Sequence, residues 1–475
     1  MKNKFPIKFL FLIIFLFFST VIIAGTINIV DCGAKGDGVT DNTAIIQKAI
    51  DDCSKKSGTV FIPSGKYLTR TLFLKSNVCL HIDFGAELLG STDLKSYHNA
   101  FPKLKGKETP ALIFARGVEN IAITGLGTIN GQGQHKNFQH GNDSDGGPKR
   151  PKIIYFIDCK NVRVQDITLI NSAYWTQDYE DCDGVIIKGI KVYSHANWNN
   201  DGLDIDSKNV VVSDCYIDCD DDALCFKSDT KRVCENITVT NCVLKSNCNA
   251  IKFGTSSYAG FKNITVTNCV ITKASEDHIR QWYRTEPWLG TTDKTVISGI
   301  ALESVDGGNM EQIMISNITM SNVQTPIFIR LGDRRRTVTN HISTIKNISI
   351  SNIIAETESK VACSITGVPG GIVENVDIRN VKLKIQGGGT QENIDEIVPE
   401  QIQSYPENRM FGVVLPASGF YVRHAKNVYF ENIQIETKTD DVRPMFYFDD
   451  VTGYEILNSR MNYEKPCVKA VNSKK

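Results

Sequence analysis

The sequence lacks an excess of charge of either sign. Its 53 Lys and Arg residues balance its 53 Asp and Glu residues, so the formal net charge at pH 7 is zero. Because phosphate binding needs a positive surface, this balance argues against nucleic acid as a partner. Long apolar runs are also missing beyond the N-terminus, where no later segment approaches the length of a membrane span.

The one long apolar run lies at the N-terminus. Lysines precede an almost unbroken apolar stretch over residues 9–23, and small residues follow it. A basic start, an apolar stretch and small residues at its end are typical of a secretory signal peptide. We therefore predict a signal peptide over residues 1–24 and a single domain over residues 25–475. The mature protein would be secreted, or periplasmic in a Gram-negative cell, and free of the membrane. An uncleaved membrane anchor is the alternative.

The composition favours strands and turns. Glycine is plentiful, at 36 residues, and Val, Ile, Asn and Thr are common. One short pattern recurs, in which apolar and polar residues alternate and a central Asn, Asp or Gly interrupts the alternation. Copies of this pattern open at Asn120, Asn161, Gly184, Asn209, Asn236, Asn263, Gln312, Asn347, Asn375 and Asn427.

This repeat predicts a solenoid of strands. Alternation with a period of two is strand periodicity, and the central polar residue suits a bend. The copies between Asn161 and Asn263 are nearly evenly spaced, with a period of roughly 25 residues, and a coil of that length cannot bury its own apolar face. Stacked coils bury it, so we predict an all-β fold, a parallel β-helix. The recurrent Asn residues would then form a turn ladder of hydrogen-bonded amides.

The open end of such a stack exposes unpaired strand edges and needs a cap. We predict a capping helix from Asp41 to Cys53, with Asp41 as its N-cap. The apolar residues of this segment fall on one helical face, and they are Ile45, Ile46, Ala49, Ile50 and Cys53.

The chain has 14 cysteines. Cys215, Cys242 and Cys269 are evenly spaced, one coil apart, and occupy the same place in the repeat. Buried free cysteine is common in protein cores. We therefore expect these three to form a stack of buried thiols, with disulfides, which secreted proteins use, as the alternative.

Acidic residues concentrate on two neighbouring coils. A little less than one coil separates Asp201 from Asp221, so they should face the same side. Asp222 and Asn249 each lie at the same distance from the opening of their own repeat, so they should be neighbours as well. Crowded carboxylates raise the pKa of at least one of them, which separates an acid from a base, as glycoside hydrolysis requires. Solvated turns or a calcium site are the alternatives.

These motifs resemble glycoside hydrolase family 28, the family of polygalacturonases and rhamnogalacturonan hydrolases. The segment from Asn199 to Gly202 is similar to the family's Asn-Thr-Asp-Gly, and Asp221-Asp222 is similar to its paired-aspartate motif. The resemblance implies a right-handed, pectin-lyase-like β-helix that inverts configuration while hydrolysing a pectic polysaccharide. It implies Asp221 as general acid, Asp201 and Asp222 as the residues that hold and activate water, and neither metal nor cofactor.

The sequence departs from the family pattern at two motifs. Asn249 stands where the family has the histidine of Gly-His-Gly, and Ala301 and Glu303 stand where it has an Arg-x-Lys pair that grips the galacturonate carboxylate. We therefore expect something other than an ordinary endo-polygalacturonase: an enzyme that cleaves rhamnogalacturonan or removes a terminal uronic acid.

Other residues could bind the substrate. The candidates are basic, amide or aromatic side chains near the acidic coils, namely Asn199, Lys227, Asn249, Lys252, His195, Trp198 and Arg330. Residues 334–336, three arginines, could also grip a carboxylate, but we favour a solvated loop for them. Loops at 130–150, 276–294 and 385–412 should shape the ends of the groove.

Two other functions fit the same motifs. A calcium-dependent pectate lyase would hold calcium with the aspartates, although no clear arginine base stands beside them. A β-helix adhesin or glycan-binding protein would bind oligosaccharide without cleaving it, but display alone does not explain acids concentrated on two coils. We expect a monomer whose partner is a pectic polysaccharide or oligosaccharide.

Overall fold

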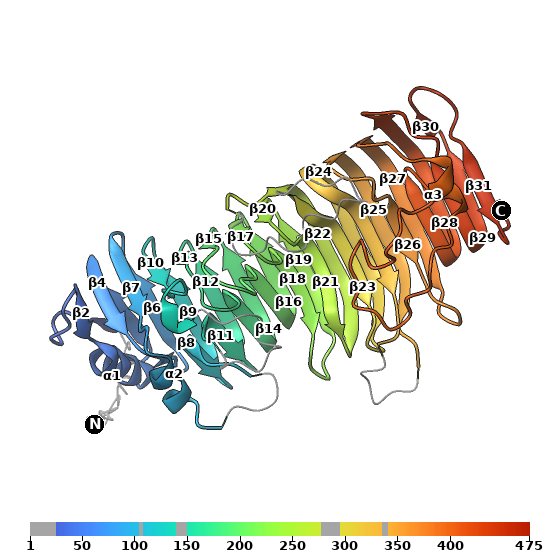
Figure 1. The fold of residues 1–475 in the computed structure, drawn as a ribbon. Coiled ribbons are helices and arrows are strands. Elements are labelled where there is room, and N and C mark those ends of the chain that lie inside the picture. Colours follow the sequence, from blue (N-terminus) through green and yellow to red (C-terminus); the bar gives the residue numbers. More distant parts are fainter. Residues whose placement is uncertain (1–24, 104–107, 139–149, 277–294, 335–340) are drawn as a thin grey trace, which may run out of the picture.

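In the computed structural model the chain winds into an elongated parallel β-helix (Figure 1). The structure describes residues 25–103, 108–138, 150–276, 295–334 and 341–475. Successive coils pair through parallel strands in three stacks, which confirms the all-β solenoid that the repeat predicts. The predicted signal peptide lies outside the described residues and stays a prediction.

Each stack has its own short strands, and the long strands bend from one stack into another. The first stack contains β1 (Gly25–Asn28), β3 (Gly58–Ile62), β6 (Val78–Ile82), β9 (Glu119–Thr124), β12 (Lys160–Gln165) and β19 (Cys234–Thr240). The second contains β2 (Asp37–Asp41), β4 (Gly65–Thr69), β7 (Ala86–Gly90), β10 (Thr128–Asn130), β13 (Thr168–Ile170), β15 (Lys191–Ser194), β17 (Tyr216–Cys219), β20 (Val243–Ser246) and β30 (Arg460–Met461). The third contains β5 (Leu72–Phe73), β8 (Ala111–Arg116), β11 (Lys152–Ile157), β18 (Leu224–Ser228), β21 (Asn249–Ser257), β23 (Val296–Ser304), β26 (Cys363–Thr366) and β31 (Val468–Val471). The strands shared between stacks are β14 (Gln177–Lys188), β16 (Leu203–Ser213), β22 (Gly260–Lys273), β24 (Asn309–Leu331), β25 (Thr344–Thr357), β27 (Val373–Ile385), β28 (Phe420–Thr437) and β29 (Phe446–Leu457).

The core fills the inside of the solenoid. Along each strand every second side chain points inward, as the period of two predicts. In register, these inward positions form aliphatic ladders, one of which runs through Val210, Ile237, Ile264, Ile313 and Ile348. All of them are buried, so each coil stabilises its neighbours through continuous apolar contact.

Ladders of asparagine hold the bends between strands. Asn236 and Asn263 adopt the left-handed backbone conformation, with φ of 58° and 54°, which Asn tolerates better than most residues. The side-chain amide of Asn263 donates to Asn236 Oδ1 at 2.8 Å, and that of Asn236 donates to Asn209 Oδ1 at 3.2 Å. The predicted turn ladder is therefore confirmed.

The predicted cysteine stack is also confirmed. Cys215, Cys242 and Cys269 are buried and free, and the thiol of Cys242 lies between the other two. No disulfide joins cysteines in the described part of the chain.

The cap is confirmed, but its predicted first residue is wrong. α1 (Thr43–Ser54) packs on β1, β3, β5 and β6 at the N-terminal end of the solenoid (Figure 1). The N-cap is Asn42, whose amide side chain bonds the backbone of Lys35. Asp41 lies one residue earlier, accepts from Thr43 N and pairs with Arg70.

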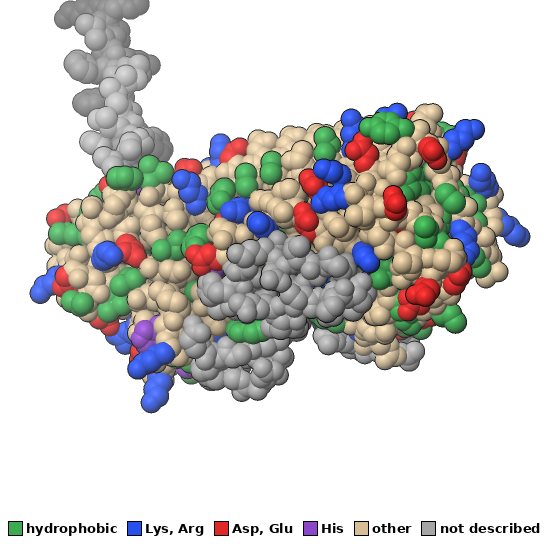
Figure 2. Space-filling model, turned by 45° about the horizontal axis from the view of Figure 1, so that its top comes forward, with side chains coloured by type: hydrophobic (Ala, Val, Ile, Leu, Met, Phe, Trp, Pro, Cys, Tyr) green, Lys and Arg blue, Asp and Glu red, His purple; other side chains and the backbone are tan. Residues whose placement is uncertain are grey.

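The other helices in the described ranges are short. They are α2 (Leu94–Ala100), α3 (Gln391–Asp395) and a 3-10 turn at Lys136–Phe138. Over the ranges that the structure describes, no helix has both the length and the apolar character needed to cross a bilayer. On the face that Figure 2 shows, basic and acidic side chains of the described residues are interspersed, in keeping with the balanced charge.

Candidate active site

The register of the third stack brings the acidic coils together on its outward face. Asp178 on β14 pairs with Asp204 on β16, Asp204 with Cys225 on β18, and Cys225 with Lys252 on β21. The row continues to Ala301 on β23. Side chains that are a full coil apart in the chain therefore stand side by side, at a spacing of about 4.8 Å per coil.

A second row runs beside this one, at the residues just before the strands. Asp201 precedes β16, Asp222 precedes β18, and Asn249 opens β21. Gly202 N donates to Asp222 O at 2.8 Å, and Asn249 Nδ2 donates to Asp222 Oδ1 at the same distance. The predicted neighbours are thus adjacent, because their repeats keep one coil length.

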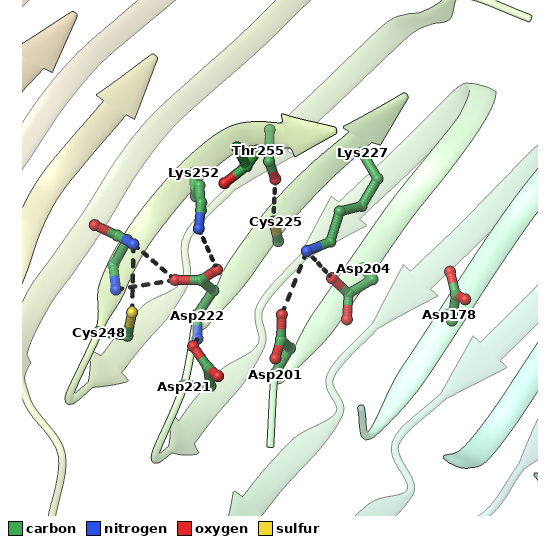
Figure 3. A network of polar contacts seen from close by, with 12 residues as sticks. Asp178, Asp201, Asp204, Asp221, Asp222, Cys225, Lys227, Cys248, Lys252 and Thr255 are labelled. Carbon is green, nitrogen blue, oxygen red and sulfur yellow. Dashed lines mark hydrogen bonds and ion pairs between the residues drawn. The ribbon is translucent and has the colours of Figure 1, made fainter. Parts of the chain in front are cut away.

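Asp222 is held in its ionised form. Lys252 Nζ lies 2.9 Å from its Oδ2, and both the backbone and the side-chain amide of Asn249 donate to its Oδ1. Burial alone would raise the pKa of Asp222, but the charges of Lys252 and Lys227 and these hydrogen bonds outweigh it and lower that pKa. Figure 3 shows Lys252 reaching from its strand onto this carboxylate.

The pKa of Asp221, the residue before Asp222, is shifted in the opposite direction. Burial, together with the charges of Asp201 and Asp222, raises the pKa of Asp221 well above the ordinary aspartate value. Its Oδ1 accepts a hydrogen bond from Asp222 N at 3.0 Å. Two adjacent carboxyl groups therefore favour opposite protonation states, which is how enzymes separate a general acid from a base.

Lys227 balances the acids of the preceding coil. Its Nζ lies 3.5 Å from Asp201 Oδ2 and 3.3 Å from Asp204 Oδ1 (Figure 3). Burial and the charge of Asp201 raise the pKa of Asp204 well above its ordinary value, so this carboxyl tends to stay protonated. Burial would lower the pKa of Lys227, but nearby acidic groups, the carboxylate of Asp201 among them, outweigh burial and raise it. Lys227 therefore stays charged.

Aromatic and basic groups continue the site toward the N-terminus. Lys152 Nζ lies 2.5 Å from Asp178 Oδ2 and 4.4 Å from the centre of the Trp175 ring. Lys227 Nζ lies 4.5 Å from the same ring. Both ammonium groups therefore lie within cation–π distance of Trp175, which holds the indole beside the aspartates.

The structure brings together some of the predicted substrate-binding residues. Lys227, Asn249 and Lys252 all contact the aspartate cluster, defined here as Asp201, Asp204, Asp221 and Asp222. Asn199 and Trp198 belong to the adjoining turn. There the buried Arg150 donates to Trp198 O at 2.7 Å and to Asn199 Oδ1 at 3.3 Å. This turn leads directly into Asp201.

His195 is engaged elsewhere. It is 2 % exposed, and its Nε2 lies 3.0 Å from Asp218 Oδ1. Asp218 in turn pairs with Lys245 at 2.9 Å. This group lies along the neighbouring strands β15, β17 and β20 of the second stack, and it gives His195 a structural partner rather than a place among the aspartates.

The predicted roles of two arginines need correction. Arg330 is fully buried, and its guanidinium donates to the backbone carbonyls of Gly367, Glu400 and Gln401, which leaves it no surface for a sugar. Arg334 is not solvated either, because it makes a two-pronged ion pair with the buried Asp306. The other two arginines of that cluster lie outside the described residues.

Two residues of the site, Asp204 and Tyr405, are absent from the substrate-binding and catalytic residues predicted above. The repeat could have predicted Asp204, because it follows Asp201 by three positions. The same spacing separates Asp222 from Cys225 and Asn249 from Lys252. Tyr405 was not visible. It comes from the segment between β27 and β28, and its Oη lies 3.1 Å from Lys252 Nζ. The sequence separation of 153 residues leaves no periodic signal for this contact.

The aspartate cluster fits a calcium ion poorly. Two groups bring donor atoms within 4.8 Å of one another, and each pairs two aspartates with a thiol, of Cys225 or of Cys248. Burial raises the pKa of both thiols, and calcium prefers six to eight oxygen ligands. Ammonium groups already lie against the carboxylates of both groups.

The fold is a right-handed parallel β-helix, and one outward face carries two adjacent carboxyl groups whose pKa values are shifted in opposite directions. This combination is typical of proteins that process polysaccharides. The chain belongs to a known family of this kind: the model of the glycosyl hydrolases family 28 matches residues 53–403.

The individual relatives agree with this assignment. A "Probable polygalacturonase" from Vitis vinifera is 29% identical over 43% of this chain and 45% of its own length. An exo-poly-alpha-D-galacturonosidase from Dickeya chrysanthemi is 38% identical over 24% of this chain and 21% of its own length. The match thus spans less than half the length of these relatives. The exopolygalacturonase structure from Thermotoga maritima superposes with a TM-score of 0.63, at 24% identity over 76% of this chain and 87% of its own, and shares its fold.

Proposed function

We propose that the chain is an inverting glycoside hydrolase that cleaves glycosidic bonds of a pectic polysaccharide. The observation that carries the proposal is the opposite pKa shift of two adjacent carboxyl groups, Asp221 and Asp222, on the face where Asp201 joins them. Glycoside hydrolysis needs one protonated and one ionised carboxyl group, and membership of family 28 supplies the polysaccharide context.

Each aspartate has a distinct part in this mechanism. The carboxyl of Asp221 donates its proton to the glycosidic oxygen as the bond to the anomeric carbon breaks. A water molecule held by Asp222 and Asp201 attacks that carbon from the opposite face, and the ionised carboxylate takes the proton that the water loses. One water is consumed, the configuration inverts, and exchange of protons with solvent restores both groups.

A lyase mechanism is less well supported. It would need a deprotonated base to remove a proton beside the substrate's carboxylate. Among the described residues, Lys227 and Lys252 are the basic groups that contact the aspartate cluster. Burial alone would lower the pKa of each, but neighbouring negative groups raise both well above the ordinary lysine value. Both lysines therefore remain ammonium ions at neutral pH.

Removal of residues from a chain end is the finer part of the proposal. The outward row of Lys252 and Ala301 continues in register to Tyr421 on β28, but Tyr421 is buried, and it packs with Phe411 and Leu415. The segment between β27 and β28 therefore covers the row on this side, and a long polymer could not lie along it. The signal peptide that the sequence predicts over residues 1–24 favours a secreted location.

One experiment tests the hydrolase. Reducing-end release would be measured on homogalacturonan, rhamnogalacturonan and short galacturonides, with EDTA present, for the wild type, Asp221→Asn and the control Asp377→Asn. Asp377 is a half-exposed residue on β27, paired with Arg379. Activity that survives EDTA and the control but falls about 10²–10⁴-fold in Asp221→Asn supports the proposal. Equal activity in Asp221→Asn, or products with a new double bond, would contradict it.

A further inference from the structure

An exposed aromatic ring stands against the buried charges of the site. Lys252 Nζ lies 2.9 Å from Asp222 Oδ2 and 3.1 Å from Tyr405 Oη, so one ammonium group joins the aspartate to the phenol. Asp222 and Lys252 are each 3 % exposed, whereas Tyr405 is 57 % exposed. Its hydroxyl is fixed and much of its ring faces solvent.

Two buried arginines fix the segment that carries this ring. Arg330 on β24 donates to the carbonyls of Glu400 and Gln401, and Arg423 on β28 donates at 2.8 Å to the carbonyls of residues 398 and 399. The two guanidinium groups also lie 5.5 and 5.7 Å from the centre of the Phe411 ring. The segment is thus anchored immediately before Tyr405.

A third anchor follows the ring. Asn408 is buried, and its side-chain amide donates to Ile297 O at 2.9 Å and to Thr325 Oγ1 at 3.0 Å. Tyr405 therefore lies between fixed points on both sides, a few residues away in each direction. A ring held in this way loses little conformational freedom when a ligand packs on it.

The described residues on the β23 side of the site disfavour the binding of a substrate carboxylate. Ala301 on β23 neighbours Lys252 and offers no charge, and Glu303, two residues on, is fully buried. Oε1 of Glu303 accepts no hydrogen bond from any residue that the structure describes, and burial raises the pKa of Glu303 to about 7. Among the residues that the structure describes on this side, Lys252 is paired with Asp222 and Arg334 with Asp306.

We propose that Tyr405 is the platform on which a sugar stacks on the β23 side of the aspartate cluster, and that this subsite takes an uncharged sugar rather than a uronate. The inference rests on the proposed function for the position of the scissile bond. An aromatic face suits the apolar side of a sugar ring, and a neighbouring buried acid suits a hydroxyl group better than a carboxylate. The substrate class is therefore a pectic chain in which uronic acid alternates with a neutral sugar.

Binding measurements test this without requiring turnover. The full chain carrying Asp221→Asn would be titrated calorimetrically with an oligosaccharide of alternating galacturonic acid and rhamnose, and with a galacturonide of equal length. We expect tighter binding of the alternating oligosaccharide. Adding Tyr405→Ala should weaken that binding about tenfold or more, whereas Tyr405→Phe should keep it within about threefold because the ring remains. Tyr463→Ala, at a tyrosine that is 77 % exposed beside Glu436, is the control.

The outcomes separate this inference from the hydrolase proposal. The inference is overturned if adding Tyr405→Ala leaves the affinity for the alternating oligosaccharide unchanged. It is also overturned if the protein that keeps Tyr405 binds the galacturonide more tightly. Either result counts even if the enzyme is active. Absence of hydrolysis in the wild type, with the binding differences intact, would overturn the hydrolase and leave the platform standing. In the active enzyme, loss of the ring should raise KM more than it lowers kcat.

Discussion

The two sides of the site are built by different means. On the side of Asp201 and Asp222, every important group sits at a fixed step in the coil, and neighbours in space are about one repeat apart in the chain. On the side of Tyr405, the segment between β27 and β28 folds back over the third stack and is fastened by buried arginines. A repeat can position functional side chains by its spacing alone. An inserted segment needs separate contacts to hold it, and these contacts do not recur with the repeat.

The largest effect should come from the repeat-built side. Asp221→Asn keeps the size of the side chain and removes its acidic proton, so kcat should fall about 10²–10⁴-fold while the melting temperature stays within a few degrees. Steady-state kinetics and thermal unfolding check this. Asp204→Asn, a change at a carboxyl that is already inclined to be neutral, should cost much less. Equal losses in the two variants would show that the cluster does not act through Asp221.

The charge on Lys252 should set the acid limb of the pH profile. The pKa of Asp222 is lowered chiefly by Lys252, against burial, so Asp222 stays ionised below the ordinary aspartate range. Lys252→Met removes that charge, and the pKa of Asp222 should rise. The acid limb of kcat/KM should then move to higher pH, by about 1–3 units. Lys262→Met, at an exposed lysine paired with Glu311, should leave the profile unchanged. An unmoved acid limb in Lys252→Met would mean that another group is the base.

A substitution that removes an anchor on the Tyr405 side should loosen only the segment between β27 and β28. Arg330→Met leaves the carbonyls of Gly367, Glu400 and Gln401 without their donor, at a cost of about 1–3 kcal/mol in the free energy of unfolding or of loop opening. Limited proteolysis should cut within residues 396–409 faster than in the wild type. KM should rise more than kcat falls. The same change at the exposed Arg379 is the control. Resistance equal to that of the wild type would show that the segment holds itself in place.

The smallest effect should come from a single rung of the asparagine ladder. Asn263→Gly keeps the left-handed backbone conformation but removes the amide, so denaturant unfolding should show a loss of about 0.5–1.5 kcal/mol. Asn263→Ala should lose about 1–2 kcal/mol more, because a Cβ is disfavoured at φ of 54°. If the two variants are equally stable, backbone conformation is not the reason for asparagine at this bend.

The sequence predicted the contacts that the repeat positions, but not those of the segment between β27 and β28. The positions of Asp222 and Asn249 predicted their contact because each stands equally far from the opening of its own repeat, and the coils keep one length. Arg330 occupies a repeat position too, yet its partners are carbonyls of a distant segment, so its interpretation as a substrate-binding residue was wrong. Local chemistry was also ambiguous at the cap, where Asn42 rather than Asp41 precedes the helix.

The division of protons between Asp221 and Asp222 is the centre of the account, and carboxyl 13C NMR titration measures it most directly. Spectra of aspartate-labelled wild type, Asp221→Asn and Asp222→Asn would assign the two carboxyl resonances by their loss. We predict that the resonance lost in Asp221→Asn belongs to a group that stays protonated well above the ordinary aspartate range. The resonance lost in Asp222→Asn should belong to a group that is already ionised below it. Two carboxyl groups that titrate together near the ordinary value, or in the reverse order, would contradict the assignment of acid and base.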